Sequence, residues 1–181
     1  MKNLKNEGTK TVGVKIQSLK GWSILLGLVL LATTAGAALA SNSDAQGHTF
    51  DSTFTKWVTS WPQTPPSKDT PANMVGVVGG DVGAGTYTGE VISTNTVGNI
   101  TSIEAFYHFN GSKHAFTARL NVTQDESAGT ATITGYVTEG WLQGASVTGE
   151  YTVLTVCPIE TPANVFGTVC FQGALHVHVP K

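Results

Sequence analysis

Two side chains that can bind a ligand or transfer a proton, Tyr107 and His114, flank the dipeptide Asn110-Gly111. Asn-Gly between two alternating segments is a strong signal for a two-residue hairpin turn. With that turn, Tyr107 pairs with His114 on the apolar face of the hairpin. A phenol and an imidazole near a cavity mouth can orient a ligand or move a proton. The alternative is a hydrogen-bonded pair near a turn, without a functional role.

The same register pairs Phe109 with Ser112 and divides the hairpin of residues 102–122 into two faces. The predicted apolar face consists of Ile103, Ala105, Tyr107, Phe109, Phe116, Ala118, Leu120 and Val122. Glu104 and Arg119 lie on the other face, where we expect a surface ion pair of small net value. The side chains that we expect to contact a ligand are Tyr107, His114, Phe109, Phe116 and, from a later strand, Tyr151.

Other polar residues give weaker indications of chemistry. His176-x-His178 places two imidazoles on one strand face, but zinc or copper needs further ligands and the sequence indicates none. Glu90 and Glu150 follow equivalent glycines and are expected to face solvent. No serine or cysteine lies in a recognisable nucleophile motif. We therefore assign no catalytic residue, no metal and no cofactor.

The pattern that dominates the chain is the alternation of β-branched and small residues. Residues 128–156 are predicted to form two strands around Glu139-Gly140, and residues 169–178 form a last strand with His176 and His178 facing outward. Gly89, Gly135, Gly149 and Gly173 each lie in mid-strand. Such glycines are typical of bends or close backbone approach, so a strongly coiled barrel is favoured over an open sandwich.

An aromatic stretch, residues 49–62, is ambiguous. Phe50, Phe54, Trp57 and Trp61 have helical spacing, whereas Phe54, Lys56 and Val58 alternate as in a strand. The aromatic side chains either cover one end of the core or form a binding lip. Residues 62–71 hold four prolines and are predicted to be a loop.

The central hairpin resembles that of allene oxide cyclases and dirigent proteins. The similar residues are Ile133-Thr134-Gly135, Gly140-Trp141-Leu142-Gln143-Gly144-Ala145, Gly149 and the aromatic strand Ala105-Phe106-Tyr107-His108-Phe109. The resemblance covers roughly residues 84–178, with extra residues at 136–139 and 146–148. It implies an eight-stranded antiparallel barrel with an apolar interior, which in that family cyclises a fatty-acid epoxide or orients phenoxy radicals. No catalytic residue of either group matches a position here, so the resemblance implies the fold alone.

The first forty residues have the order of a secretory signal peptide. Five lysines precede an apolar run, and Ala38-Leu39-Ala40 matches a cleavage site. An uncleaved anchor helix is the alternative. We expect a signal peptide over 1–40, a polar, proline-rich and aromatic segment over 41–72, and a barrel over 73–181. The protein is then secreted or held in the cell envelope.

Charge and cysteine content agree with export. Residues 1–40 contain five lysines and one glutamate, so the rest carries 5 basic and 11 acidic residues and a net charge of −6. This balance argues against nucleic acid and anionic lipid as partners. Cys157 and Cys170 are expected to form a disulfide, because exported proteins meet an oxidising compartment.

The sequence is compatible with three functions. The first is a barrel that binds a small apolar ligand or a partner without catalysis. The second is an isomerase or cyclase of the resembled type that uses Tyr107, His114 or both. The third is an envelope or matrix protein that adheres through Trp57, Trp61 and Trp141.

Overall fold

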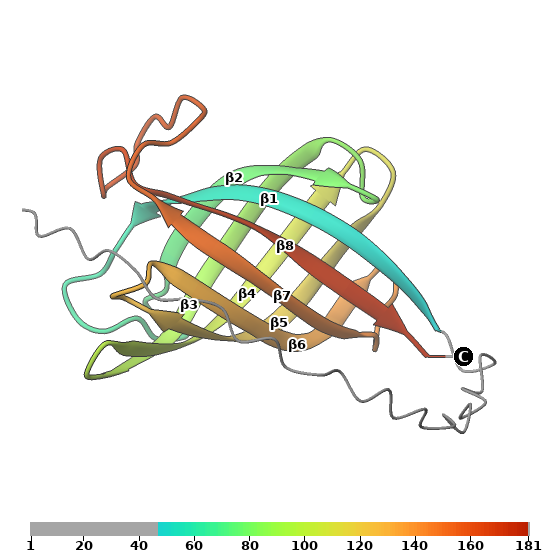
Figure 1. Cartoon of the computed structure of the whole chain (residues 1–181), viewed down its shortest axis with the longest axis horizontal. Helices are drawn as coiled ribbons and strands as arrows, with labels where there is room; N and C mark the ends of the chain where they lie inside the picture. The colour runs from blue at the N-terminus through green and yellow to red at the C-terminus, as the bar shows by residue number, and fades with distance from the viewer. Residues whose placement is uncertain (1–46, 181) are drawn as a thin grey trace, which may run out of the picture. The chain divides into compact units, whose positions relative to one another are not determined.

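The computed structural model describes residues 47–180, which form a closed, eight-stranded antiparallel barrel (Figure 1). Each strand pairs with its neighbours in sequence, and the first strand pairs with the last. The strands are β1 His48–Ser60, β2 Ala72–Gly80, β3 Gly85–Val97, β4 Ile100–Gly111, β5 Ala115–Asp125, β6 Thr130–Gly140, β7 Ser146–Leu154 and β8 Cys170–Val179. The prediction of an eight-stranded antiparallel barrel is confirmed.

The predicted signal peptide lies outside the described residues. Within residues 47–180, no helix is long and apolar enough to cross a bilayer.

The aromatic stretch is a strand, and it belongs to the barrel. Residues 48–60 form β1, which pairs with both β2 and β8 and so closes the sheet. The barrel therefore begins at His48, and the expected boundary at residue 73 is wrong. The helical spacing of the aromatics is compatible with a strand because residues 54–58 of β1 are buried on both faces. Phe54 and Val58 point inward, while Thr55 and Trp57 are also buried.

The hairpin of β4 and β5 has the predicted faces but a different register. Phe109 pairs with Phe116 and Tyr107 with Ala118, so each partner lies four positions further along β5 than expected. The turn spans residues 111–114, because the amides of residues 112–114 donate to carbonyls of the β2–β3 connection at 2.9–3.2 Å. An even shift keeps every side chain on its face. The pairing of Tyr107 with His114 is therefore wrong.

The mid-strand glycines allow close approach between strands, as predicted. A Cβ at Gly135, Gly149 or Gly173 would lie 2.0–2.3 Å from a carbonyl oxygen of the neighbouring strand. At Gly89, the conflict would be with the hydroxyl of Tyr87, at 2.3 Å. Sheet coiling and side-chain packing at these positions therefore require glycine.

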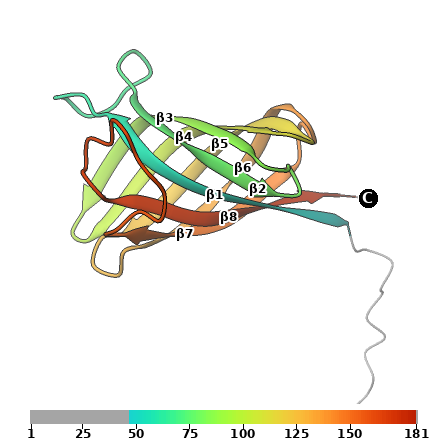
Figure 2. The same ribbon diagram turned by 90° about the horizontal axis from the view of Figure 1, so that it is seen from above.

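The two ends of the barrel differ (Figure 2). At the end that carries the β4–β5 turn, the rings of His114 and Trp141 stack at 3.9 Å, and Phe50 meets Trp141 edge-on at 4.8 Å. Further inside, Phe109 and Phe116 stack at 4.8 Å. Aromatic side chains thus fill this half, which we call the packed end. The opposite end carries the long connections 61–71 and 155–169.

Candidate ligand-binding cavity

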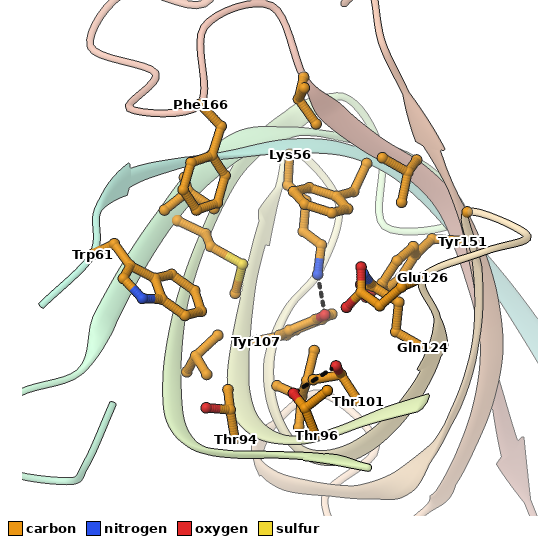
Figure 3. A pocket seen from close by; sticks show the side chains of 18 residues that line it. Lys56, Trp61, Thr94, Thr96, Thr101, Tyr107, Gln124, Glu126, Tyr151 and Phe166 are labelled. Atoms are coloured by element: carbon orange, nitrogen blue, oxygen red, sulfur yellow. Dashed lines mark hydrogen bonds between the residues drawn. The ribbon is translucent and has the colours of Figure 1, made fainter. Parts of the chain in front are cut away.

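A cavity of about 510 Å³ occupies the half of the barrel opposite the packed end (Figure 3). Its wall is mostly apolar. The aliphatic lining consists of Val58, Met74, Val91, Ile103, Val153 and Val169. Its lining includes Trp61 and Glu126, both of which are exposed, so the cavity is open to the surface. Volumes of roughly 300–1,000 Å³ are usual for small-molecule sites, so the cavity has the size of a ligand pocket.

The amino group of Lys56 projects into this cavity (Figure 3). The alternation of β1 that turns Phe54 and Val58 inward also turns Lys56 inward, and its side chain is only 2 % exposed. A lysine is rarely so buried unless it is paired. Lys56 forms no ion pair with any carboxylate of residues 47–180. The barrel therefore holds a buried amine without a counter-ion.

The surroundings of Lys56 are aromatic. Its Nζ atom donates a hydrogen bond to the hydroxyl of Tyr107. The same atom lies 3.9–5.8 Å from the centroids of five rings, those of Tyr107, Tyr151, Phe54, Phe171 and Tyr87. Burial lowers the pKa of Lys56 well below its usual value, because an apolar medium disfavours the charged form. Burial raises the pKa of Tyr107 for the same reason. Burial therefore increases the neutral fraction of the Lys56 amine relative to an exposed lysine and keeps the phenol of Tyr107 protonated.

Apart from Lys56 and Tyr107, the cavity lining has few polar side chains. The hydroxyl of Tyr151 donates a hydrogen bond to Oε1 of Gln124, and burial raises the pKa of this tyrosine. The hydroxyl oxygens of Thr96 and Thr101 are 2.9 Å apart. These hydroxyl and amide groups are already paired with each other, and the carboxylate of Glu126 belongs to an exposed residue, so Lys56 is the buried polar group best placed to meet a ligand.

The disulfide-bonded loop contributes to the mouth. The predicted bond between Cys157 and Cys170 is present, with Cα atoms 5.4 Å apart. The loop reaches β1, where the amide of Val165 donates to the carbonyl of Val58 at 2.9 Å. Phe166 then faces Trp61 with ring centroids 5.7 Å apart. Figure 3 shows both rings at one side of the cavity.

The five predicted ligand contacts are divided between the two ends of the barrel. Tyr107 and Tyr151 line the cavity. Phe109 and Phe116 belong to the packed core, and His114 lies in the β4–β5 turn against Trp141. An acid–base pair of Tyr107 and His114 is therefore not formed.

The surface residues singled out in the sequence have ordinary partners. Arg119 donates to Glu104 from Nε at 2.8 Å, which confirms the predicted ion pair. His176 lies 2.7 Å from Asp51, and the hydrogen bond with this carboxylate raises the histidine's pKa. His178 lies within 3.1 Å of two threonine hydroxyls. Within residues 47–180, no group of three or more His, Cys, Asp or Glu is arranged to hold a metal ion.

Sequence reasoning did not identify Lys56 as a site residue. Its position between Phe54 and Val58 was the available signal, since a strand that turns those two inward also turns Lys56 inward. Comparison of the chain with protein-family models, curated proteins and solved structures finds no match. The cavity and the amine of Lys56 are therefore the structural features that bear on function.

Proposed function

We propose that this protein is a secreted β-barrel that binds a small apolar ligand in the cavity beside Lys56, without catalysis. The observation that carries the proposal is an apolar cavity of about 510 Å³ inside a closed barrel. A barrel that served only as a stable support would fill this space with side chains, because protein interiors are normally close-packed. The site suits a ligand with an apolar body and one polar group, which would meet Lys56.

The packed end supports this interpretation by contrast. There, paired aromatic rings fill the interior, as the stacking of Phe109 on Phe116 illustrates. At the other end, Trp61 and Phe166 are 44 % and 43 % exposed at the rim. Exposed aromatic residues beside an apolar opening are typical of a binding site. A ligand that passes this rim would cover apolar surface that is otherwise in contact with water.

The other two functions receive less support. A cyclase that uses Tyr107 together with His114 lacks the required contact, because His114 packs against Trp141 at the packed end. An adhesive role was expected to use Trp57, Trp61 and Trp141. Trp57 is only 7 % exposed and Trp141 packs against His114 and Phe50, so Trp61 alone of the three is exposed. We retain membership of the allene oxide cyclase and dirigent superfamily as a proposal, supported by the hairpin motif and by a closed eight-stranded barrel.

Export is also part of the proposal. The leader-like order of residues 1–40 and the Cys157–Cys170 disulfide both support a secreted or envelope location, with membrane contact only through the leader. The acidic remainder of the chain makes nucleic acid an unsuitable partner. The polar group that would meet the ligand is the Lys56 side chain, so the proposed binding involves no cofactor.

Titration with N-phenyl-1-naphthylamine, whose fluorescence rises in apolar surroundings, tests ligand binding. We expect saturable binding of one probe per chain. Ile103→Trp fills part of the cavity and should weaken binding at least about tenfold, since lost apolar burial costs about 25 cal/mol per Å². The matched control is Val77→Trp, at a position that is 42 % exposed and outside the cavity. Non-saturable binding, or equal binding by a folded Ile103→Trp variant, would overturn the proposal.

A further inference from the structure

Lys56 provides the cavity with a group that can react covalently. We propose that its amine forms an imine with an aldehyde or ketone group of the bound apolar ligand. This inference rests on the proposed ligand-binding function and specifies the chemical class of the ligand. A carbonyl group is the polar group that a neutral amine can capture, and the rest of such a ligand can remain entirely apolar.

The amine of Lys56 can contact a ligand in the cavity, while the surrounding rings limit its contact with water. Lys56 lines the cavity, and its side chain is almost fully buried. Figure 3 shows Nζ pointing toward the cavity interior, beside Tyr107 and Tyr151. Imine formation releases water, so an apolar site from which bulk water is excluded favours the condensed product. The rings around Nζ supply these surroundings.

The protonation state supports the same chemistry. Only the neutral amine has a free electron pair, and burial lowers the pKa of Lys56. Desolvation in an apolar pocket is an established way to activate a lysine as a nucleophile toward carbonyl compounds. Within residues 47–180, no carboxylate forms an ion pair with Lys56 that would hold it as ammonium. A larger fraction of Lys56 than of an exposed lysine is therefore neutral and able to attack a carbonyl carbon.

The reaction balances without an oxidant or reductant. The electron pair of Nζ attacks the carbonyl carbon to form a C–N bond, and the carbonyl oxygen gains a proton to give a carbinolamine. Loss of that hydroxyl as water breaks the C–O bond and leaves the C=N bond, and the two hydrogens of the water account for the two that nitrogen has lost. Tyr107 is hydrogen-bonded to Nζ and retains its proton at neutral pH. It can therefore donate a proton to the departing oxygen and recover one from nitrogen.

A carboxylate ligand is the competing possibility, because it would supply Lys56 with a counter-ion. Such a ligand would bind reversibly and would hold the amine as ammonium. An ammonium has no electron pair with which to attack a carbonyl carbon. The two ligand classes therefore predict opposite outcomes in a trapping experiment.

Reductive trapping with decanal tests the proposal. The full chain is incubated at pH 7 with decanal and sodium cyanoborohydride, which converts an imine into a stable secondary amine. Intact mass and peptide mapping then locate the decyl group. Lys68 and Lys113 are exposed and lie outside the cavity lining, so they serve as internal references. We expect Lys56 to be labelled at least tenfold faster than either reference, with one decyl group per chain at early times.

Two variants and two competitors complete the experiment. Lys56→Met should abolish the rapid labelling, whereas Lys113→Met should not change it. 1-Decanol fits the same cavity but cannot form an imine, so it should slow labelling of Lys56 alone. If Lys56 is labelled no faster than Lys68 or Lys113, the proposal of imine formation is overturned, even when 1-decanol binds in the cavity. Tight binding of decanoic acid that depends on Lys56, with no trapped decanal, assigns a carboxylate ligand instead. Absence of binding by all three compounds overturns the proposed ligand-binding function itself.

Discussion

The amine of Lys56 donates a hydrogen bond to the hydroxyl of Tyr107 inside the barrel, although 51 residues separate them in the chain. Strand β1 supplies the lysine and β4 supplies the tyrosine. The bond forms only because both strands turn these side chains inward at a similar depth. It satisfies two polar groups that would otherwise be costly to bury. Among residues 47–180, Lys56 is the only strongly basic residue in the cavity lining.

The first prediction concerns the pH dependence of stability. The pKa of Lys56 is lower in the folded state than its ordinary value of about 10.4. Between these two pKa values, the unfolded chain binds a proton that the folded chain lacks, so the free energy of unfolding contributed by Lys56 rises with pH. Lys56→Met should therefore be more stable than wild type at pH 7, and its advantage should shrink as the pH approaches 10. Urea titrations of both proteins from pH 6 to pH 10 measure the difference.

A constant difference between the two proteins across that range would contradict the prediction. It would mean that Lys56 has the same pKa in both states. Lys113→Met is the matched control, because Lys113 is exposed. Its stability relative to wild type should not depend on pH over this window.

The second prediction concerns the role of Tyr107 in imine formation. Tyr107→Phe removes the hydroxyl and keeps the ring, so binding of 1-decanol should change little. The initial rate of decanal trapping at Lys56 should fall about tenfold or more, since a positioned proton donor contributes at least that much. Raising the buffer concentration should partly restore the rate, because a small acid can replace the lost donor. An unchanged rate with unchanged 1-decanol affinity would show that Tyr107 does not transfer the proton.

The third prediction concerns the glycines that permit strand coiling. Gly149→Ala should destabilise the barrel by about 1–3 kcal/mol, the usual cost of overpacking. The new Cβ would lie 2.3 Å from the carbonyl oxygen of Ala174. Gly79→Ala is the control, because its Cβ would meet only the hydroxyl of Thr53, at 3.0 Å. Chemical denaturation should show a clearly larger loss for Gly149→Ala, and equal losses would refute the close-approach argument.

The fourth prediction concerns the loop closed by the disulfide. Replacing Cys157 and Cys170 together by alanine should lower the free energy of unfolding by about 3 kcal/mol, the value for a loop of about 15 residues. Binding of the naphthylamine probe should also weaken, because the loop positions Phe166 at the mouth. Thermal denaturation and probe titration of the double variant measure the two effects. Undiminished probe affinity would show that the loop does not shape the site.

Much of the fold was predictable because it depends on the alternation of side chains. The two faces of the β4–β5 hairpin follow from a period of two, and the mid-strand glycines indicated a coiled sheet. The register was not predictable from Asn110-Gly111 alone. The amides of the turn bond to Val82 and Ala84 in another connection, and a local turn signal carries no information about such a distant partner.

The candidate site was predictable only in part, and the reason lies in β1. Tyr107 and Tyr151 could be placed on apolar faces from their own strands. Lys56 lies in a strand buried on both sides, where Thr55 and Trp57 are as inaccessible as the inward residues. Alternation is then hidden, and helical spacing fits the aromatics equally well. The sequence left helix and strand open for this stretch, and Lys56 faces the interior because residues 48–60 form a strand.

NMR of methyl-labelled protein titrated with 1-decanol measures whether the cavity beside Lys56 binds a small apolar ligand. We expect saturable shifts at the methyl groups of Val58, Val91 and Ile103, which line the cavity. Methyl groups outside the cavity lining, such as those of Val82 and Val177, should shift little. Shifts confined to exposed residues, or an absence of saturable shifts at the cavity methyls, would contradict ligand binding in this cavity.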